Sequence, residues 1–308
     1  MQRLGRVTVD EFDGDQSGLS AVLGGTFRMG AGALYDEEGP VREVEVAPFR
    51  IDLRPVSNRD FAAFVRATGH VTAAERAPSP EHYPDVDPGR LKPGALAFQP
   101  SRGPAGHWRE WWSYVPGATW LKPDGKASVY RGRLDHPVVC VGFEDALAYA
   151  LWAGKDLPTE AEWELAARGG LDGAVYAWGD ERRPGGRTMA KTWVGEFPHQ
   201  NLAPPGQKAT SQPGAFPANG HGLFDMIGNV WEWTKDYFVT GGASAGCCGA
   251  AASRDPDLPG VKIPRRVVKG GSHLCHESYC DRYRPAARQP QMEDTATTHI
   301  GFRCVLRD

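Results

Sequence analysis

The clearest local structural signal in this chain is the segment Leu157-Pro158-Thr159-Glu160-Ala161-Glu162-Trp163-Glu164-Leu165-Ala166-Ala167-Arg168-Gly169-Gly170. Thr159 and Glu162 have the spacing of a capping box, in which two side chains satisfy free N–H groups at the start of a helix. Gly169 is expected to end the helix in the left-handed conformation, which glycine adopts at low cost. The apolar residues at helical spacing are Trp163, Ala166 and Ala167. The segment predicts a short helix that buries its tryptophan.

Two further helices are predicted upstream. The first begins after Ser57, which can form a capping box with Asp60, and it ends at Gly69. Its buried stripe is predicted to contain Phe61, Phe64 and Val65. The second covers residues 143–153, with apolar positions at Ala146, Leu147, Ala150 and Leu151. Three helices in the first 170 residues and almost none afterwards predict an α+β fold with irregular loops.

Short alternating or apolar segments predict the strands. Residues 23–30 and 41–46 are expected to pair as a hairpin. Residues 136–141 predict a short buried strand, and residues 299–305 predict a closing strand. If residues 229–234 are extended, the side chains on one face are Asn229, Trp231 and Trp233.

Composition favours one large domain with ordered loops. The 308 residues contain no internal repeat and no break in composition, so we expect an N-terminal extension over residues 1–21 and one domain over residues 22–308. The 38 glycines and 25 prolines predict much irregular backbone, whereas ten tryptophans indicate a compact core. Residues 77–135 lack periodicity and predict a long functional loop. Its aromatic residues can either line a binding groove or fill the core; they include Trp108, Trp111 and Trp112.

Charge and hydropathy exclude several classes of function. The net charge is −3 with no basic block, which argues against nucleic acid and a membrane surface as partners. The first 20 residues are rich in acidic side chains and lack an apolar run of signal-peptide length, and no segment reads as membrane-spanning. These features predict a bacterial cytoplasmic protein with reduced thiols.

Six cysteines are too few for a disulfide scaffold in a chain of this length. Cys304 is interpreted as a small buried hydrophobe. The adjacent Cys247 and Cys248 are interpreted as bystanders, because such neighbours rarely chelate one metal or pair with each other.

Cys275 and Cys280 form the chemically most informative pair, within Gly270-Gly271-Ser272-His273-Leu274-Cys275-His276-Glu277-Ser278-Tyr279-Cys280-Asp281-Arg282-Tyr283-Arg284. The C-x4-C spacing differs from the C-x-x-C of dithiol oxidoreductases and from paired zinc motifs. Thiolates are soft ligands and strong nucleophiles, and Arg282 and Arg284 are expected to lower the thiol pKa values. The pattern favours chemistry; the alternative is a structural role, as one buried and one surface cysteine or as a bridge.

Five segments together resemble the ordered signatures of the formylglycine-generating enzyme (sulfatase-modifying factor) family. They are residues 24–30, 157–164, 228–233, 269–272 and 301–304. The resemblance extends from about Val22 to Val305, and residues 272–284 resemble the active segment of members that retain both cysteines. Residues 108–120 and 299–304 are most similar to actinobacterial members. The resemblance implies a single domain of modified C-type-lectin-like fold, with little regular secondary structure and long ordered loops.

The resemblance also implies an activity. Members of the family use O2 to oxidise a cysteine to Cα-formylglycine, within a Cys-X-Pro-X-Arg motif of an unfolded or nascent sulfatase polypeptide. Cys275 and Cys280 would hold Cu(I), with the substrate thiolate as a third ligand. We expect a monomer.

The resemblance implies roles for neighbouring residues. Ser272 and Tyr279 would form hydrogen bonds near the metal or the substrate cysteine. Trp231 would form one side of the pocket that binds O2. The alternatives from the residues alone are a turn serine and a core tryptophan. The ligands of a structural Ca²⁺ would be the side chains of Asn229 and Glu232 and the carbonyl groups of Ile227 and Val230. A second calcium site of the family is not expected, because Lys191 occupies a ligand position and can itself supply positive charge.

Other readings of the residues remain open. His273, His276 and His299 could join the cysteines in a zinc or iron site, giving a related non-haem metalloenzyme. A lectin-type module or non-catalytic sulfatase-binding homologue on the same scaffold would not need both cysteines. A dithiol oxidoreductase would use the pair as a disulfide without metal.

Overall fold

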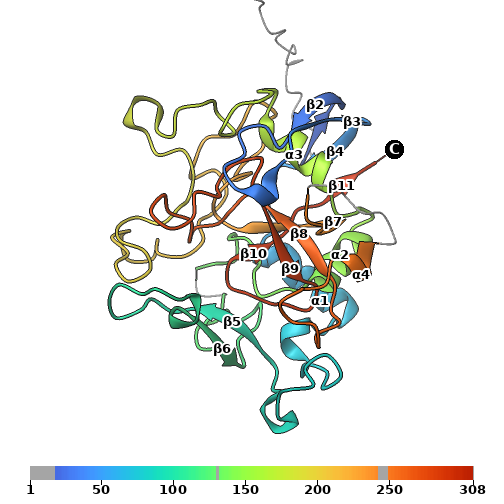
Figure 1. The fold of residues 1–308 in the computed structure, drawn as a ribbon, viewed down its shortest axis with the longest axis vertical. Coiled ribbons are helices and arrows are strands. Elements are labelled where there is room, and N and C mark those ends of the chain that lie inside the picture. The colour runs from blue at the N-terminus through green and yellow to red at the C-terminus, as the bar shows by residue number, and fades with distance from the viewer. Residues whose placement is uncertain (1–17, 130–131, 242–248, 308) are drawn as a thin grey trace, which may run out of the picture.

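A computed structural model describes residues 18–129, 132–241 and 249–307. It consists of short strands and helices joined by long loops (Figure 1). The α-helices are α1 (Asn58–Thr68), α2 (Phe143–Trp152), α3 (Glu160–Arg168) and α4 (Gly249–Ala252). Single 3-10 turns are η1 (Asp36–Glu38), η2 (Ala73–Glu75), η3 (Pro88–Arg90), η4 (Trp108–Glu110) and η5 (Pro184–Gly186).

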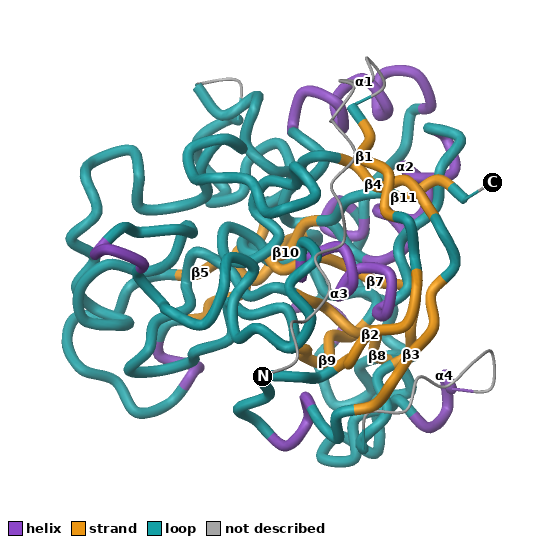
Figure 2. Tube along the Cα trace, turned by 90° about the horizontal axis from the view of Figure 1, so that it is seen from above, coloured by secondary structure: helices purple, strands orange, loops and turns teal. Residues whose placement is uncertain are grey.

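The strands form two small sheets and two hairpins. One sheet has the order β1-β4-β11, with β1 (Leu19–Val22), β4 (Phe49–Asp52) and β11 (Val305–Leu306) antiparallel to their neighbours. The other has the order β10-β7-β8-β9, with strands β10 (Ile300–Gly301), β7 (Trp231–Tyr237), β8 (Arg265–Lys269) and β9 (Arg288–Met292). The hairpins pair β2 (Gly25–Met29) with β3 (Arg42–Val46), and β5 (Gly94–Phe98) with β6 (Trp112–Pro116). Helices and strands gather on one side of the molecule, and loops occupy much of the other (Figure 2).

The local helix signals are confirmed. Ser57 and Asp60 form the capping box of α1, and Gly69 ends that helix with φ 70°. Thr159 and Glu162 cap α3, which Gly169 ends with φ 57°. The predicted helix at residues 143–153 corresponds to α2, and the predicted hairpin of residues 23–30 and 41–46 is β2–β3.

Four other predictions need correction. Residues 77–135 are not one structureless loop, because they contain the β5–β6 hairpin. Residues 136–141 are buried but do not form a regular strand, since Cys140 adopts φ 58° and the backbone bonds alternately to Val56 and Thr297. Residues 299–305 divide into β10 and β11, which belong to different sheets.

The fourth correction concerns the strand expected at residues 229–234. It begins only at Trp231, since Asn229 has φ 57° and lies outside β7. The expected boundary between residues 21 and 22 also falls inside β1, which is paired with β4. Cys247 and Cys248 lie outside the described residues.

The core is built around ion pairs as well as apolar side chains. Trp163 of α3 is fully buried and donates its Nε1–H to Glu232 Oε2 at 2.7 Å. Arg303 Nε lies 2.8 Å from Glu232 Oε2, and Arg303 Nη2 lies 2.9 Å from Glu232 Oε1. Cys304 is fully buried in an adjacent apolar cluster, as predicted. In the described ranges, no helix combines the length and apolar character needed to cross a bilayer.

Candidate active site

Two glycines after β8 allow the cysteine segment to fold back on itself. Gly270 has φ 95° and Gly271 has φ 72°, a region that side-chain-bearing residues rarely adopt. A Cβ atom on Gly270 would lie 2.7 Å from the carbonyl oxygen of Met226, and one on Gly271 would lie 2.6 Å from that of Arg282. The close approach at Gly271 brings the start of the segment against its end.

This fold brings Cys275 and Cys280 together. Their sulfur atoms lie 3.3 Å apart, and both are free thiols. A covalent S–S bond is about 2.05 Å long, so the pair is reduced and shares a hydrogen bond. The Cys280 N–H donates to the His276 carbonyl oxygen at 2.8 Å, and the Cys275 N–H donates to that of Ser272 at 3.0 Å. Cys275 is 1% exposed, whereas Cys280 is half-buried.

The two thiols differ in acidity. The hydrogen bond shared with Cys275 lowers the pKa of Cys280, and the Arg282 guanidinium lowers it further. The same hydrogen bond and burial raise the pKa of Cys275 well above its usual value. The arrangement therefore favours a thiolate at Cys280 that accepts a hydrogen bond from a protonated Cys275. The Cys280 thiolate would be both a nucleophile and a soft metal ligand, and it is the less buried of the two sulfur atoms.

Ser272 organises the turn around Cys275. It is fully buried, its hydroxyl accepts from the Leu274 N–H at 3.2 Å, and its own N–H donates to Cys275 Sγ at 3.4 Å. Ser272 therefore contacts a predicted ligand through its backbone, while its side chain has the turn role considered as the alternative.

Trp231 does not contact the pair in the described structure. It is 2% exposed and packs in the apolar cluster of α1 and α2, whereas Cys275 belongs to the separate cluster around α3. The oxygen-pocket role of Trp231 stays a prediction.

An aromatic wall, defined here as Phe98, Trp111, Trp193, Phe197 and Tyr279, borders the pair. The Tyr279 ring is half exposed, lies parallel to Phe197 with centroids 4.5 Å apart, and meets Trp111 edge-on at 5.4 Å. Phe197 in turn contacts Trp193 and Phe98 at 5.3 and 5.8 Å. The backbone N–H of Trp193 donates to the Cys275 carbonyl oxygen at 3.0 Å, so the aromatic wall is hydrogen-bonded to the cysteine segment.

The three tryptophans of residues 108–112 lie in different surroundings, and the binding groove expected there stays a prediction. Trp111 reaches Tyr279, whereas Trp112 packs one step away against Phe98 and His299, and Trp108 is 47% exposed. Sequence reasoning missed Phe98, Trp193 and Phe197. Trp193 and Phe197 are single aromatic residues in loops and carry no periodic signal, and the strand β5 that ends at Phe98 was not predicted.

A clamp of charged residues holds the end of the cysteine segment. Arg182 Nη2 lies 2.6 Å from Asp281 Oδ2, and Arg182 also pairs with Glu277. On the opposite side, Arg282 pairs with Glu37 at 2.6 Å. Arg282 also lies over the Tyr35 ring at 4.2 Å, and the Tyr35 hydroxyl accepts from the Asp281 N–H at 3.0 Å. Sequence reasoning missed Tyr35, Glu37 and Arg182.

The histidines do not complete a mixed metal site. His273 is buried, and its Nδ1 bonds to the Asn229 carbonyl oxygen at 2.8 Å. Burial lowers the pKa of His273 to about 4 and that of His299 to about 3. His276 Nδ1 lies 2.8 Å from the Ser278 hydroxyl. Within the part of the chain that the structure describes, no three His, Cys, Asp or Glu side chains are grouped to hold a metal ion. The zinc or iron alternative thus gains no support.

The expected calcium ligands fit only in part. Both oxygens of Glu232 are used by Arg303 and Trp163, so Glu232 does not fit the ligand role predicted for it. Asn229 lies beside Asp225, with Nδ2 donating to Asp225 Oδ2 at 3.2 Å. Asp225 Oδ1 is buried with no partner among the described residues, and burial raises the pKa of Asp225 to about 6. A carboxylate so placed would be stabilised by a nearby cation.

Lys191 is also buried near Asn229. Its carbonyl oxygen accepts from the Asn229 N–H at 2.8 Å, and its ammonium donates to the Gln207 carbonyl oxygen. Burial lowers the pKa of Lys191. Its contact with a loop carbonyl is compatible with the expected positive charge at this position.

Comparison with known proteins decides the family. Residues 8–308 match the model of the sulfatase-modifying factor enzyme 1-like domain. The chain belongs to this family. It is 53% identical to a formylglycine-generating enzyme of Mycobacterium tuberculosis, over 92% of this chain and 95% of the relative. It is 48% identical to one of Thermomonospora curvata, over 93% of this chain and 92% of the relative.

A solved structure of low sequence identity shares the fold. PvdO from Pseudomonas aeruginosa aligns with a TM-score of 0.59 and 22% identity, over 94% of each chain. The single-domain fold expected from the family resemblance is thereby confirmed, with few helices and small mixed sheets.

Proposed function

We propose that this protein converts a cysteine of a sulfatase polypeptide to Cα-formylglycine, with O2 as the oxidant. The observation that carries the proposal is the pair of reduced thiols 3.3 Å apart, one buried and one partly exposed, in a chain related to formylglycine-generating enzymes. Tyr279, the exposed member of the aromatic wall beside Cys280, gives an unfolded polypeptide an aromatic surface to contact, and Phe197 and Trp111 support its ring.

The donor set fits Cu(I) better than the other metals considered. Two thiolates suit a soft ion that tolerates low coordination, whereas structural zinc requires four closed ligands. Cys275 and Cys280 would hold the ion, which when bound would supply the one-electron chemistry that lets O2 react with a thiol. The protein's own residues orient the two ligands. Ser272 orients Cys275, and the clamp formed by Tyr35, Glu37 and Arg182 orients Cys280.

The test is mass spectrometry of a peptide containing Cys-X-Pro-X-Arg, incubated in air with the protein, with and without Cu(I). The expected result is a copper-dependent loss of about 18 Da from the peptide, as a CH2–SH group becomes an aldehyde. Cys275→Ala and Cys280→Ala should abolish it, and Cys304→Ala serves as the matched control for loss of a buried thiol away from the pair. Conversion that persists in both pair variants would refute the proposal.

A dithiol oxidoreductase is the second candidate, because two thiols 3.3 Å apart can also close to a disulfide. It predicts turnover that a Cu(I) chelator does not affect. Loss of turnover with the chelator, restored by added copper, would favour the oxidase. Copper binding with no turnover of any cysteine peptide would favour a non-catalytic homologue.

We also propose a structural Ca²⁺ beside Asn229, with the Ile227 and Val230 carbonyl groups as candidate ligands. The orphaned oxygen of Asp225 supports a cation there, and oxygen donors suit calcium. Protein treated with EGTA should melt at a lower temperature than protein with added Ca²⁺. Asp225→Asn should remove the difference; an equal difference in the variant would contradict this site.

A further inference from the structure

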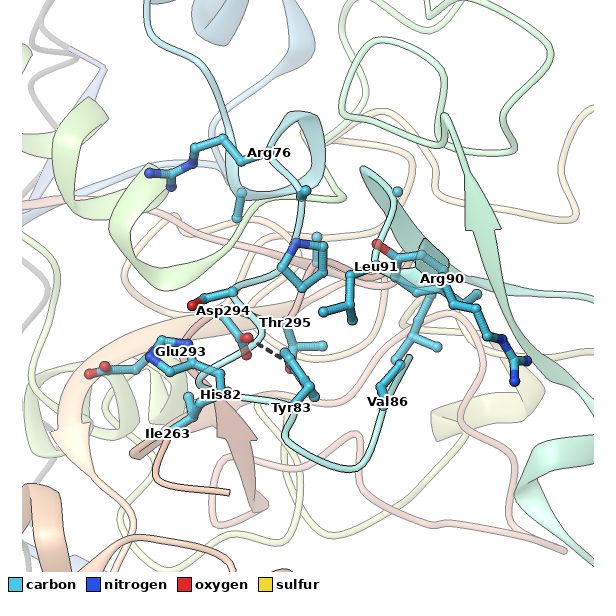
Figure 3. Close-up of a pocket in the computed structure, with 18 of the residues that line it drawn as sticks. Arg76, His82, Tyr83, Val86, Arg90, Leu91, Ile263, Glu293, Asp294 and Thr295 are labelled. Atoms are coloured by element: carbon cyan, nitrogen blue, oxygen red, sulfur yellow. Dashed lines mark hydrogen bonds between the residues drawn. The ribbon is translucent and has the colours of Figure 1, made fainter. Parts of the chain in front are cut away.

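A second cavity lies outside the cysteine site. Its volume is about 770 Å³, within the range of pockets that take small organic ligands. Segments far apart in sequence enclose it: residues 73–91, the start of β5, Tyr114 of β6, residues 262–264 and residues 293–296 (Figure 3). Neither Cys275 nor Cys280 lines it.

An incompletely paired carboxylate lies in the lining of this cavity. Asp294 Oδ2 accepts from the Tyr83 hydroxyl at 2.6 Å, as Figure 3 shows. Asp294 Oδ1 is enclosed and has no hydrogen-bond partner among the described residues. Buried polar atoms are almost always paired, so this carboxylate is under-satisfied and would be stabilised by a cation bound beside it. Burial also raises the pKa of Asp294, which a nearby positive charge would reverse.

Aromatic and apolar side chains surround the carboxylate. The Tyr114 hydroxyl donates to the Lys92 carbonyl oxygen at 2.6 Å, which fixes its ring in the wall of the cavity. Together with Tyr83 it offers aromatic surface that can receive a cation. The apolar part of the lining includes Leu91, Leu96 and Ile263. A ligand with one charged group and an apolar body matches this lining.

The charges of the lining favour a cation. It has five carboxylates and three Lys or Arg side chains, and one of the carboxylates, Glu293, is paired with Arg266 outside the lining. Arg76 is paired with Glu144 at 3.5 Å, while Arg90 is exposed at the rim. An anion would have to be buried beside Asp294, at a large cost in electrostatic energy. A bare metal ion is disfavoured too, since the described residues group no three His, Cys, Asp or Glu side chains around one point.

We infer that this pocket binds an organic cation, an alkyl guanidinium or ammonium group on an apolar body, with Asp294 as its counter-ion and Tyr83 and Tyr114 as its aromatic wall. The group can come from a free small molecule or from a basic side chain of a polypeptide. The second source is sterically reasonable, because Leu96 in the pocket and Phe98 in the aromatic wall are two residues apart on the same face of β5, about 7 Å from each other.

Direct binding of n-butylguanidinium, followed by ligand-observed NMR, tests the site without relying on the proposed catalytic function. We expect binding to the wild-type protein and none to neutral n-butylurea. Asp294→Asn should weaken binding at least about tenfold, and Tyr83→Phe should weaken it less, since the aromatic ring remains. Asp85→Asn is the control, because it removes the same charge from the exposed rim of the pocket.

Melting curves establish whether each variant is folded. If the Asp294→Asn variant does not fold, the Tyr83→Phe variant still tests the site. The inference is overturned if the wild-type protein does not bind the cation, if n-butylurea binds equally well, or if Asp294→Asn and Asp85→Asn weaken binding equally.

A second arm distinguishes the two sources and rests on the proposed function. Two cysteine peptides that differ only in one flanking Arg or Gln are compared as substrates. If the cation belongs to the polypeptide, Asp294→Asn should raise the KM of the Arg peptide about tenfold relative to that of the Gln peptide. If it is a free molecule, the ratio of the two KM values should equal that of the wild type. Absence of turnover with both peptides would refute the proposed function, while the binding experiment would still decide the site.

Discussion

The sulfur atoms of Cys275 and Cys280 lie 3.3 Å apart, yet Cys275 is buried and Cys280 is partly exposed. The shared hydrogen bond raises the pKa of the buried thiol and lowers that of Cys280, so it favours the proton on Cys275 and the negative charge on Cys280. The pair therefore combines a protected sulfur with a reactive one.

Among the four cysteines that the structure describes, Cys280 should react first with iodoacetamide at neutral pH. The other described cysteines, Cys140, Cys275 and Cys304, are almost completely buried and should react more slowly. In Cys275→Ala the Cys280 thiolate loses its hydrogen bond, so its alkylation should slow several-fold. Peptide mapping by mass spectrometry measures each site separately. Equal labelling of Cys275 and Cys280 would contradict the assignment of the thiolate.

Arg182→Ala should reduce turnover with little loss of stability. Arg182 is about one-third exposed and holds Asp281, the residue next to Cys280, so its removal frees that end of the segment. We expect kcat to fall about tenfold, as for misplacement of a reacting group by a fraction of an ångström. Arg183→Ala, an exposed neighbour, is the control. Similar kinetics in both variants would show that the clamp does not position Cys280.

Phe197→Leu should weaken the use of peptide substrates. The Phe197 ring stacks on Tyr279, and such pairs contribute about 0.5–1.5 kcal/mol, which corresponds to a roughly 2- to 10-fold lower kcat/KM if the contact orders the wall. Trp108→Leu removes a larger but 47% exposed ring at the edge of the same region. If the Trp108 variant loses more activity than the Phe197 variant, the peptide binds near residues 107–110 and not along the aromatic wall.

Arg303→Leu should destabilise the fold strongly. Glu232 would be left buried without its cation, and breaking such a pair costs about 3–5 kcal/mol in the free energy of unfolding. Arg59→Ala removes an exposed ion pair with Asp135 and should destabilise the protein much less. Urea unfolding of both variants measures the difference, and a small loss in Arg303→Leu would contradict the role of this pair in the core.

The free energy of unfolding should rise with pH between about 3 and 6.5, partly through His299. The imidazole of His299 has a pKa of about 3 in the folded protein and of about 6.5 in the unfolded chain. Between these two pH values the unfolded chain therefore binds one more proton than the folded protein does. One such group contributes a slope of up to about 1.4 kcal/mol per pH unit. His299→Gln should reduce the slope. Unfolding measured at several pH values checks this, and an unchanged slope would show that His299 is protonated in the fold.

The helices could be predicted because their signals are local. Each capping box involves residues three positions apart, and each terminal glycine acts on its own turn, so Ser57 with Asp60 and Thr159 with Glu162 carry the information by themselves. The strand prediction at residues 136–141 failed because burial was mistaken for sheet pairing. An apolar run is compatible with either, and only the partners of its backbone decide between them.

The cysteine site was recognised from its own segment, but its surroundings were not. Arg182 and Asp281 are 99 positions apart, and Tyr35 and Asp281 are 246 apart, so no local pattern predicts the clamp. Phe197 and Tyr279 meet for the same reason only in the folded chain.

Short-range chemistry and ordered motifs were enough to predict the three helices, the β2–β3 hairpin, the family and the two cysteines. Tertiary structure alone decided which thiol is buried and which charges hold the segment. It also decided that Glu232 pairs with Arg303, an assignment that changes its interpretation from a calcium ligand to a core ion pair. These outcomes depend on long-range contacts and on burial, which set the pKa values and the partners of each side chain.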